Sequence, residues 1–266
     1  MDRKQFLKLL GTSVATGFLV RSFEPKQAAA MGLTALQFSG TTLADWKTVL
    51  GDGLWTAPNQ VPVNNADIQT DQTSTKSILR ANISQRGVMA HNITYKSLID
   101  QDLFEYIHTT SYEFRLPYIP QTNSGIQNAQ TFEGGFFIWD GSQTQLDYGC
   151  AFQWVLNPWM STFGTVYSWS SDGATQGWIP CGFLQPDTNW HQYQMMVDYH
   201  NQTCRLTIDQ TSIPICFTAT PKVGWGTETA ARFQTEIISI WPGNTSIAPS
   251  HAVEIRNWNW NLQPYT

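Results

Sequence analysis

The sequence predicts an all-β protein, built as a sandwich or barrel with one or two short helices. Its apolar and aromatic residues fall into about a dozen short segments, which Gly, Pro, Asn and Asp separate, as is typical of strands and turns. Charged residues make up only 13% of the 266 residues and aromatic residues another 13%. This composition excludes disordered and coiled-coil chains, so we expect one packed core.

The first thirty residues have the three parts of a bacterial export signal. The first eight residues carry three cations, an apolar-leaning stretch follows, and Ala28–Ala30 supplies small residues for cleavage. The order resembles a twin-arginine signal with Lys4 in place of the second arginine. We therefore expect residues 1–30 to be a signal peptide and residues 31–266 to be one domain in the periplasm or outside the cell. The alternative is that this segment forms a first helix of the domain.

The mature chain is mildly acidic. Removing five basic and two acidic residues with the signal leaves ten basic and eighteen acidic residues, a net charge of −8. Neither sign forms a long run, which argues against a nucleic-acid partner or a polybasic membrane patch. We expect no membrane span after signal removal, and partners that are neutral or small. The oligomeric state is not predicted.

The segments follow in order from one short helix to a series of strands. Leu43, Trp46 and Leu50 are spaced as on a helix that stops at Gly51, and residues 55–75 are predicted to be loop or edge strand. A second helix-like piece is Tyr95–Ile107. The predicted strands are Ser77–Ile83, Gly87–Thr94, Thr110–Leu116, Gly135–Trp139, Gln145–Leu156, Gly164–Trp169, Gly177–Leu184, His191–Tyr199, Cys204–Ile208, Ile213–Phe217, Ala231–Trp241 and Ala252–Asn259.

Four cysteines remain in the mature chain, an even number that suits an oxidising compartment. Three pairings are open, and we take Cys150 with Cys181 as the candidate disulfide. A three-residue hairpin loop would instead place Cys204 opposite Cys216. A two-residue turn at Gln210–Thr211 gives a better apolar match and faces those two cysteines apart. Free buried thiols are the remaining alternative.

Two stretches resemble the concanavalin A-like lectin and glucanase superfamily. In Trp190–Tyr199 a Trp-His pair opens a strand and an Asp ends it, and the next strand, from Cys204, runs into the Asp209 turn. Val253–Trp258 is similar to the last strand of that fold. The resemblance implies an antiparallel jelly roll of two sheets, each with about six strands, and a concave sheet face that holds ligand.

The resemblance does not choose between lectins, glycoside hydrolases and polysaccharide lyases, because all three share the fold. The Glu-x-Asp-x-x-Glu strand of the retaining glucanases is absent from the sequence. The Arg-x-Glu and Gln-x-His strands of the alginate-lyase branch are absent as well. The best-known activities of the superfamily therefore do not transfer to this chain.

Strand alternation selects charged candidates for a ligand groove. Glu113 and Arg115 share one face of their strand, and Glu254 and Arg256 share one face of theirs. They are candidates for a polar groove, and the alternative is that they form ordinary cross-strand ion pairs.

Amides and tryptophans supply the neutral candidates. Gln153, Gln192 and Gln194 point away from the aromatic faces of their strands, where amides suit sugar hydroxyls or simply keep the surface soluble. Among twelve tryptophans, Trp159, Trp178 and Trp225 lie in or beside turns and are candidate platforms for sugar rings. The tryptophans inside strands, Trp139, Trp154 and Trp169, are expected in the core.

If the protein is an enzyme, general acid–base chemistry would use His91, Glu113, Arg115 or Glu133. His108 and Asp140 are further candidates, although strand histidines are commonly structural and Asp140 suits a hairpin turn. No serine-hydrolase elbow, phosphate loop or zinc-protease helix occurs. No cofactor is evident, and calcium is the one metal considered.

We therefore expect an exported protein that binds a neutral polysaccharide or similar ligand on the concave face of a jelly roll. The first alternative is a polysaccharide lyase or glycoside hydrolase with a nonstandard active site. The second is an envelope interaction protein without a small ligand.

Overall fold

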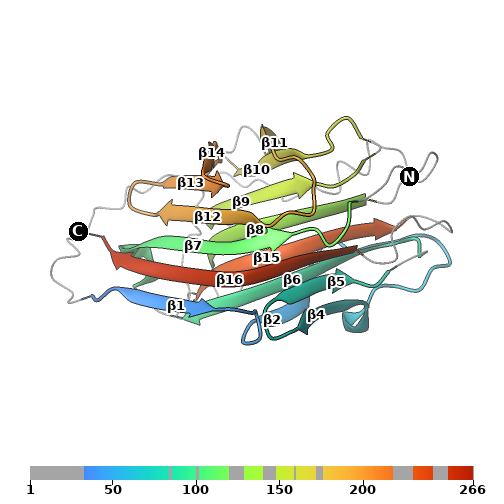
Figure 1. The fold of residues 1–266 in the computed structure, drawn as a ribbon, viewed down its shortest axis with the longest axis horizontal. Helices are drawn as coiled ribbons and strands as arrows, with labels where there is room; N and C mark the ends of the chain where they lie inside the picture. Colours follow the sequence, from blue (N-terminus) through green and yellow to red (C-terminus); the bar gives the residue numbers. More distant parts are fainter. Residues whose placement is uncertain are drawn as a thin grey trace, which may run out of the picture.

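Two antiparallel β-sheets pack face to face in the computed structural model (Figure 1). The structure describes residues 33–83, 86–99, 102–119, 129–139, 148–158, 160–171, 176–217, 230–241 and 251–265. Its elements are β1 (Leu36–Gly40), β2 (Lys47–Leu50), β3 (Trp55–Thr56), η2 (Asn65–Asp67), β4 (Ile68–Gln72), β5 (Ser77–Ala81), β6 (Val88–Ile99), η3 (Leu103–Glu105), β7 (Tyr106–Arg115), β8 (Ala129–Trp139), β9 (Tyr148–Val155), β10 (Thr165–Ser171), β11 (Gln176–Phe183), β12 (His191–Asp198), β13 (Thr203–Ile208), β14 (Thr211–Ile213), β15 (Ala230–Trp241) and β16 (His251–Pro264).

Each sheet has eight strands, so the sandwich is confirmed with more strands per sheet than the six expected. The first sheet has the order β14-β13-β12-β7-β16-β5-β4, with β1 also paired to β16. The second sheet has the order β11-β10-β9-β8-β15-β6-β2, with β3 also paired to β6. Every pairing is antiparallel, and strands far apart in sequence, such as β8 and β15, become neighbours.

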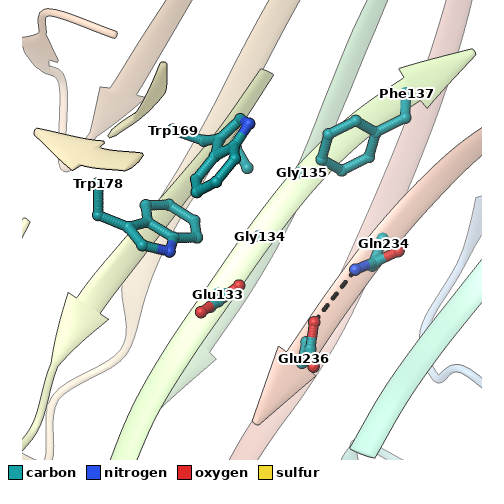
Figure 2. A pocket seen from close by; sticks show the side chains of 9 residues that line it. Glu133, Gly134, Gly135, Phe137, Trp169, Trp178, Gln234 and Glu236 are labelled. Carbon is teal, nitrogen blue, oxygen red and sulfur yellow. Dashed lines mark hydrogen bonds between the residues drawn. The ribbon is translucent and has the colours of Figure 1, made fainter. Parts of the chain in front are cut away.

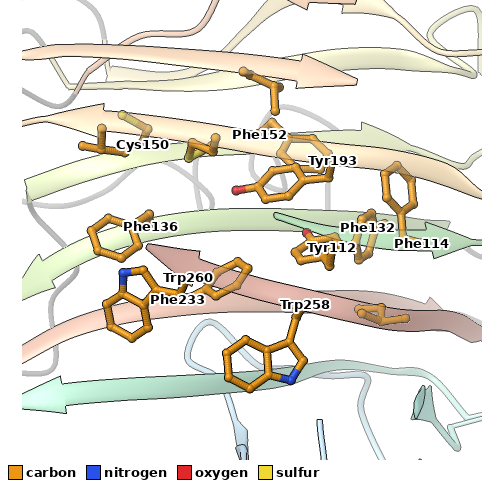
Figure 3. Packing of buried hydrophobic residues seen from close by; sticks show 14 of the residues in the cluster. Tyr112, Phe114, Phe132, Phe136, Cys150, Phe152, Tyr193, Phe233, Trp258 and Trp260 are labelled. Carbon is orange, nitrogen blue, oxygen red and sulfur yellow. The ribbon is translucent and has the colours of Figure 1, made fainter. Parts of the chain in front are cut away.

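The core lies between the sheets and is rich in aromatic rings (Figure 3). Burial along β7 alternates strictly, which places Tyr112 and Phe114 inward and Glu113 outward. On the second sheet Phe132 and Phe136 of β8 face the same core. Each fully buried ring of this kind stabilises the fold by about 1.5–3 kcal/mol. This alternation leaves the opposite face of each sheet for polar residues.

The two predicted helices are absent from the described segments. The helical spacing around Leu43 belongs to turns that lead into β2, where β-branched Thr48 and Val49 pair with the edge of β6. The stretch from Tyr95 continues β6 to Ile99, because β15 supplies a hydrogen-bonding partner along that whole length. What remains helical in the described residues is two three-residue 3-10 turns, η2 and η3.

The hairpin signature has a structural role at the start of β12. Asp209 accepts a hydrogen bond from the Gln192 amide at 2.8 Å, and its other oxygen lies 2.7 Å from His191 Nδ1. The β13–β14 turn is formed by Asp209 and Gln210, both with positive φ, one residue before the turn we predicted. Primed turns of this kind match the twist of a tight hairpin.

Candidate functional site

A hollow of about 170 Å³ opens on the outer face of the second sheet, opposite the core. It lies over β8, β9, β10, β11 and β15 (Figure 2). Its lining residues are Glu133, Gly134, Gly135, Phe137, Ala151, Trp169, Trp178, Gln234 and Glu236. The lining therefore combines two acids, one amide and three aromatic rings.

Two glutamates face each other across the strand boundary at the floor of the hollow. Glu133 on β8 and Glu236 on β15 are register partners, so their side chains leave the same face of the sheet. Both residues are largely buried, with exposed fractions of 9% and 5%. Between directly opposed residues, two like charges destabilise the pair unless something neutralises one of them.

Different donors hold the two carboxylates. Gln153, the register partner of Glu133 on β9, donates its Nε2 hydrogen to Glu133 Oε1. Gln234 donates to Glu236 Oε2 at 3.3 Å, and His91 Nδ1 lies 2.8 Å from Glu236 Oε1. Gln153 therefore positions the carboxylate of Glu133, and His91 and Gln234 position that of Glu236.

Burial is the main reason that the pKa of Glu133 lies well above its usual range. The nearby Glu236 charge raises this pKa further, and the hydrogen bond from Gln153 opposes the rise without cancelling it. Glu133 thus keeps its proton to a higher pH than an exposed glutamate does. A carboxyl group in this state can donate a hydrogen bond or a proton.

An arginine adds positive charge on the same face. Arg232 lies two positions before Gln234 on β15, and its guanidinium sits 3.8 Å from the ring centre of Tyr95. Burial lowers the pKa of Arg232 to about 10, while Tyr95 and Glu236 act to raise it. Arg232 therefore remains a cation at neutral pH.

Aromatic rings wall the hollow on two sides. Trp169 and Trp178 are register partners on β10 and β11, with ring centroids 5.5 Å apart at 67°. Figure 2 shows this pair on one side of Glu133, with Glu236 on the other. Phe137 lies over Gly135, where an added Cβ would come within 2.5 Å of its ring. The absence of a side chain at position 135 thus leaves room for the Phe137 ring against the strand.

The structure divides the residues predicted from sequence between the two outer faces. Glu133, Gln153, Trp178 and His91 belong to the second sheet and gather in or beside the hollow. The remaining candidates with described positions lie on the first sheet: Glu113, Arg115, Gln192, Gln194, Glu254 and Arg256. Trp159, Trp225, Asp140 and the signal segment lie outside the described residues.

On the first sheet the charged candidates form a ladder of ion pairs. Arg256 donates from Nε and Nη2 to Glu113 Oε2 at 2.8 and 2.6 Å. Arg115 Nε donates to Glu254 at 2.6 Å, and Lys76 Nζ donates to the other oxygen of Glu254 at 2.5 Å. Glu113 and Glu254 therefore each have at least one cation as a partner.

The pKa values on the first sheet shift opposite to that of Glu133. Partial burial acts to raise the pKa of Glu113, but hydrogen bonds from Asn257 and Arg256 outweigh it, so the pKa falls below its ordinary value. The pKa of Glu254 is lowered in the same way by Lys76 and Arg115.

The Trp190 ring packs against the two arginines of this ladder. The guanidinium carbon of Arg256 lies 4.0 Å from the ring centre, and that of Arg115 lies 4.7 Å from it.

Sequence reasoning missed most of the hollow. Trp169 was expected in the core and instead lies half-buried in the hollow, whereas Trp154 is fully buried as expected. Gln234 and Glu236 were not considered, although the alternation Arg232-x-Gln234-x-Glu236 within an apolar strand marks an outward polar face. That alternation is the signal that could have found them.

His108, a further candidate for acid–base chemistry, lies in the core of the sandwich and not in the hollow. His108 is fully buried, with Nε2 2.8 Å from the Leu103 carbonyl and Nδ1 accepting from Trp260 at 3.2 Å. Burial lowers the pKa of His108 to about 4. The four cysteines are free thiols.

Among the described residues, no three His, Cys, Asp or Glu side chains gather in a way that could hold a metal ion. The calcium expectation stays a prediction. In the same part of the chain, no helix is long and apolar enough to cross a membrane.

Comparison with families of known proteins and with curated proteins finds no match. Among solved structures, the chain is similar to the winged bean acidic lectin complexed with methyl-α-D-galactose (8% identity, TM-score 0.49, 88% of this chain and 100% of that one). It is also similar to a lectin from Bauhinia forficata in complex with GalNAc (10%, 0.46, 88% and 100%). A third is a Bacillus subtilis protein of unknown function with a galectin-like fold (12%, 0.46, 84% and 92%).

Proposed function

We propose that the outer face of the second sheet binds an uncharged polysaccharide in the hollow. The observation that carries this proposal is the Trp169–Trp178 pair beside the buried polar set of Glu133, Gln234 and Glu236. Aromatic faces suit the apolar faces of sugar rings. Carboxyl and amide groups suit their hydroxyls, because together they offer both donors and acceptors.

The charge of the site favours a neutral glycan over an acidic one. Glu133 and Glu236 lie together at the floor of the hollow, and the mature chain has an expected net charge of −8. A uronic acid polymer would bring further carboxylates against this pair, and none of the described residues that line the hollow is a lysine or an arginine. The same argument disfavours a lyase, whose substrates carry uronic acids.

Tryptophan fluorescence with a panel of soluble neutral glycans tests this proposal. We expect saturable quenching by at least one glycan, and Trp178→Ala should weaken its binding at least tenfold. The matched control is Trp190→Ala, which removes a ring from the opposite face and should leave the affinity unchanged. Equal losses in both variants, or no quenching by any neutral glycan, would contradict the proposed site. The second of these outcomes would favour an interaction protein without a small ligand.

Glycoside hydrolysis is a second candidate, favoured by the raised pKa of Glu133 beside Glu236. Two carboxyl groups in different protonation states are what acid-assisted cleavage of a glycosidic bond needs. Protonated Glu133 would give its proton to the leaving oxygen. Glu236 would either attack the anomeric carbon or take a proton from the attacking water.

Reducing-end assays on the same glycan mixtures separate binding from cleavage. If the protein is a hydrolase, product forms with the wild type, and Glu133→Gln and Glu236→Gln each lower the rate by at least 100-fold. Glu113→Gln is the control, because this acid lies on the other face. Saturable binding without product would leave the binding module as the function.

We also propose that the chain is exported to the periplasm or the cell exterior. Residues 1–30 support this through their cation, apolar and small-residue order. Cell fractionation of the expressed full chain, with N-terminal sequencing of the secreted form, tests it. A mature terminus near Met31 is the expected result, and retention of the intact chain in the cytoplasm would overturn it.

A further inference from the structure

The acid pair of the hollow, Glu133 and Glu236, has one carboxyl oxygen without a partner among the described residues. At Glu236, His91 Nδ1 lies 2.8 Å from Oε1, and Gln234 donates to Oε2 at 3.3 Å. At Glu133, Gln153 donates to Oε1, and no other described residue hydrogen-bonds this carboxyl group. Glu133 Oε2 is therefore the oxygen of the pair that a ligand can reach without displacing a protein partner.

The proton of the acid pair belongs on that same oxygen. Glu133 and Glu236 are register partners and largely buried, so two ionised carboxylates would repel each other there. Glu236 is the better stabilised anion, because it has partners on both oxygens and Glu133 on only one. Since the Gln153 nitrogen can only donate, Glu133 Oε1 accepts and the proton lies on Oε2. Glu133 thus offers an O–H donor, whereas Glu236 retains lone pairs that can accept.

The two tryptophans of the hollow add further donors. An indole nitrogen can donate a hydrogen bond but cannot accept one. Among the described residues, none accepts a hydrogen bond from Trp169 or Trp178. In contrast, Trp154 Nε1 in the core donates to the Leu184 carbonyl oxygen at 3.0 Å. The N–H groups of the two lining tryptophans are therefore available to a carbonyl oxygen of a ligand.

An apolar patch, formed by Ala151 and Phe137, lies in the same hollow as these donors. Ala151 on β9 is the register partner of Gly135 on β8 and presents only a methyl group. The Phe137 ring takes the space of a side chain at position 135, where an added Cβ would lie 2.5 Å from it. Figure 2 shows the rings of Trp169 and Phe137 on either side of Gly135. A methyl group of a ligand therefore finds apolar carbon beside the hydrogen-bonding groups.

We infer that the glycan unit in this hollow carries an acetamido group, as N-acetylhexosamines do. This inference rests on the proposed function and names the ligand class of the same site. An acetamido group brings a carbonyl oxygen for the Glu133 and indole donors, an N–H for Glu236, and a methyl group for the apolar patch. A hydroxyl group in its place would leave the apolar patch without a partner. An ammonium group would place a charge against that patch, which is unfavourable.

Three tetrasaccharides that differ in one substituent test this inference. The tetramers of β(1→4)-linked N-acetylglucosamine, glucose and glucosamine share their linkage and ring stereochemistry and differ only at the second carbon. Each is titrated into the full chain at pH 7, and binding is followed by tryptophan fluorescence and by calorimetry. We expect the acetylated tetramer to bind about tenfold tighter than either of the other two.

Two substitutions in the hollow show whether these groups cause the preference. Ala151→Leu fills the space beside the apolar patch, and Glu133→Met removes the O–H donor. Each should lower the affinity for the acetylated tetramer to that for the glucose tetramer. Glu113→Met makes the same change of side chain on the opposite outer face and should keep the wild-type preference. The wild-type titrations decide the question even if a variant fails to fold.

The outcomes separate this inference from the proposed function. A glucose tetramer that binds the wild type as tightly as the acetylated tetramer would overturn the inference and leave the hollow a site for neutral glycans. Fluorescence quenching only by neutral glycans without acetamido groups would do the same. Tightest binding of the glucosamine tetramer would overturn both, because the preferred ligand would then be a cation. If no glycan binds, the proposed function fails and the inference fails with it.

Discussion

The outer faces of the two sheets each carry a set of glutamates, and the sets differ in what faces them. On the first sheet Glu113 and Glu254 meet Arg256, Arg115 and Lys76 within hydrogen-bonding distance. On the second sheet Glu133 meets another acid, Glu236, across the strand boundary. The pKa values of Glu113 and Glu254 are lowered, whereas that of Glu133 is raised.

This difference indicates what each face is for. Acids with matched cations stabilise a sheet surface, although weakly where water screens them. Acids brought together in a partly dry hollow reduce stability, and proteins keep such arrangements mainly where they bind or transform a ligand. This contrast supports our proposal that the ligand binds on the second face.

Among substitutions of these acids, Glu254→Gln on the first face should have the largest effect on the free energy of unfolding. This change weakens two charged hydrogen bonds to a carboxylate whose side chain is only 7% exposed. We expect a loss of about 1.5–3 kcal/mol in the free energy of unfolding at pH 7. The lowered pKa means that this stability is present above the unfolded pKa and disappears as the pH falls through the folded value. Urea unfolding of both proteins across that range measures it.

The same substitution on the second face should act in the opposite direction. Glu133→Gln removes an acid that burial and Glu236 destabilise when it is ionised, and an amide can fill the same space. We expect the variant to be more stable at pH 7 by about 0.5–2 kcal/mol. Because the folded pKa is raised, this gain should vanish as the pH falls below the unfolded pKa. A Glu133→Gln variant that is less stable than the wild type at pH 7 would contradict the proposed difference between the two faces.

Glu113→Gln should give the smallest effect. Its side chain is 27% exposed and its partner Arg256 is 34% exposed, so solvent screens the pair. We expect a loss of about 0.2–1 kcal/mol, which addition of 1 M sodium chloride to the wild type should largely mimic. Thermal unfolding at low and high salt measures it. A loss as large as that for Glu254→Gln would show that solvent exposure does not determine how strongly each ion pair stabilises the fold.

Much of the fold could be predicted from the sequence, because strand alternation is a local signal. The β7 pattern from Tyr106 to Arg115 is readable without any knowledge of its neighbours. The helical spacing near Leu43 misled us, because a few apolar residues in a turn can imitate helix periodicity, whereas the pairing of Lys47–Leu50 with β6 is a long-range contact.

The site could be predicted only in part, because its side chains are brought together by strands that are far apart in the sequence. The outward direction of Glu133 and Gln153 follows from alternation, but the meeting of Glu133 with Glu236 needs the pairing of β8 with β15, about a hundred residues apart. Likewise, Glu113 and Arg256 looked like groove residues because each was judged along its own strand. Their mutual ion pair exists only once β7 lies beside β16.

The most direct test follows the Glu133 and Glu113 carboxyl groups by ¹³C NMR as the pH changes, with and without a neutral oligosaccharide that quenches the tryptophan fluorescence. Glu133→Gln and Glu113→Gln assign the two signals. We predict that Glu133 titrates above the usual glutamate range and Glu113 below it, and that the oligosaccharide shifts only the Glu133 titration. An ordinary pKa for Glu133, or an oligosaccharide effect confined to Glu113, would contradict this account.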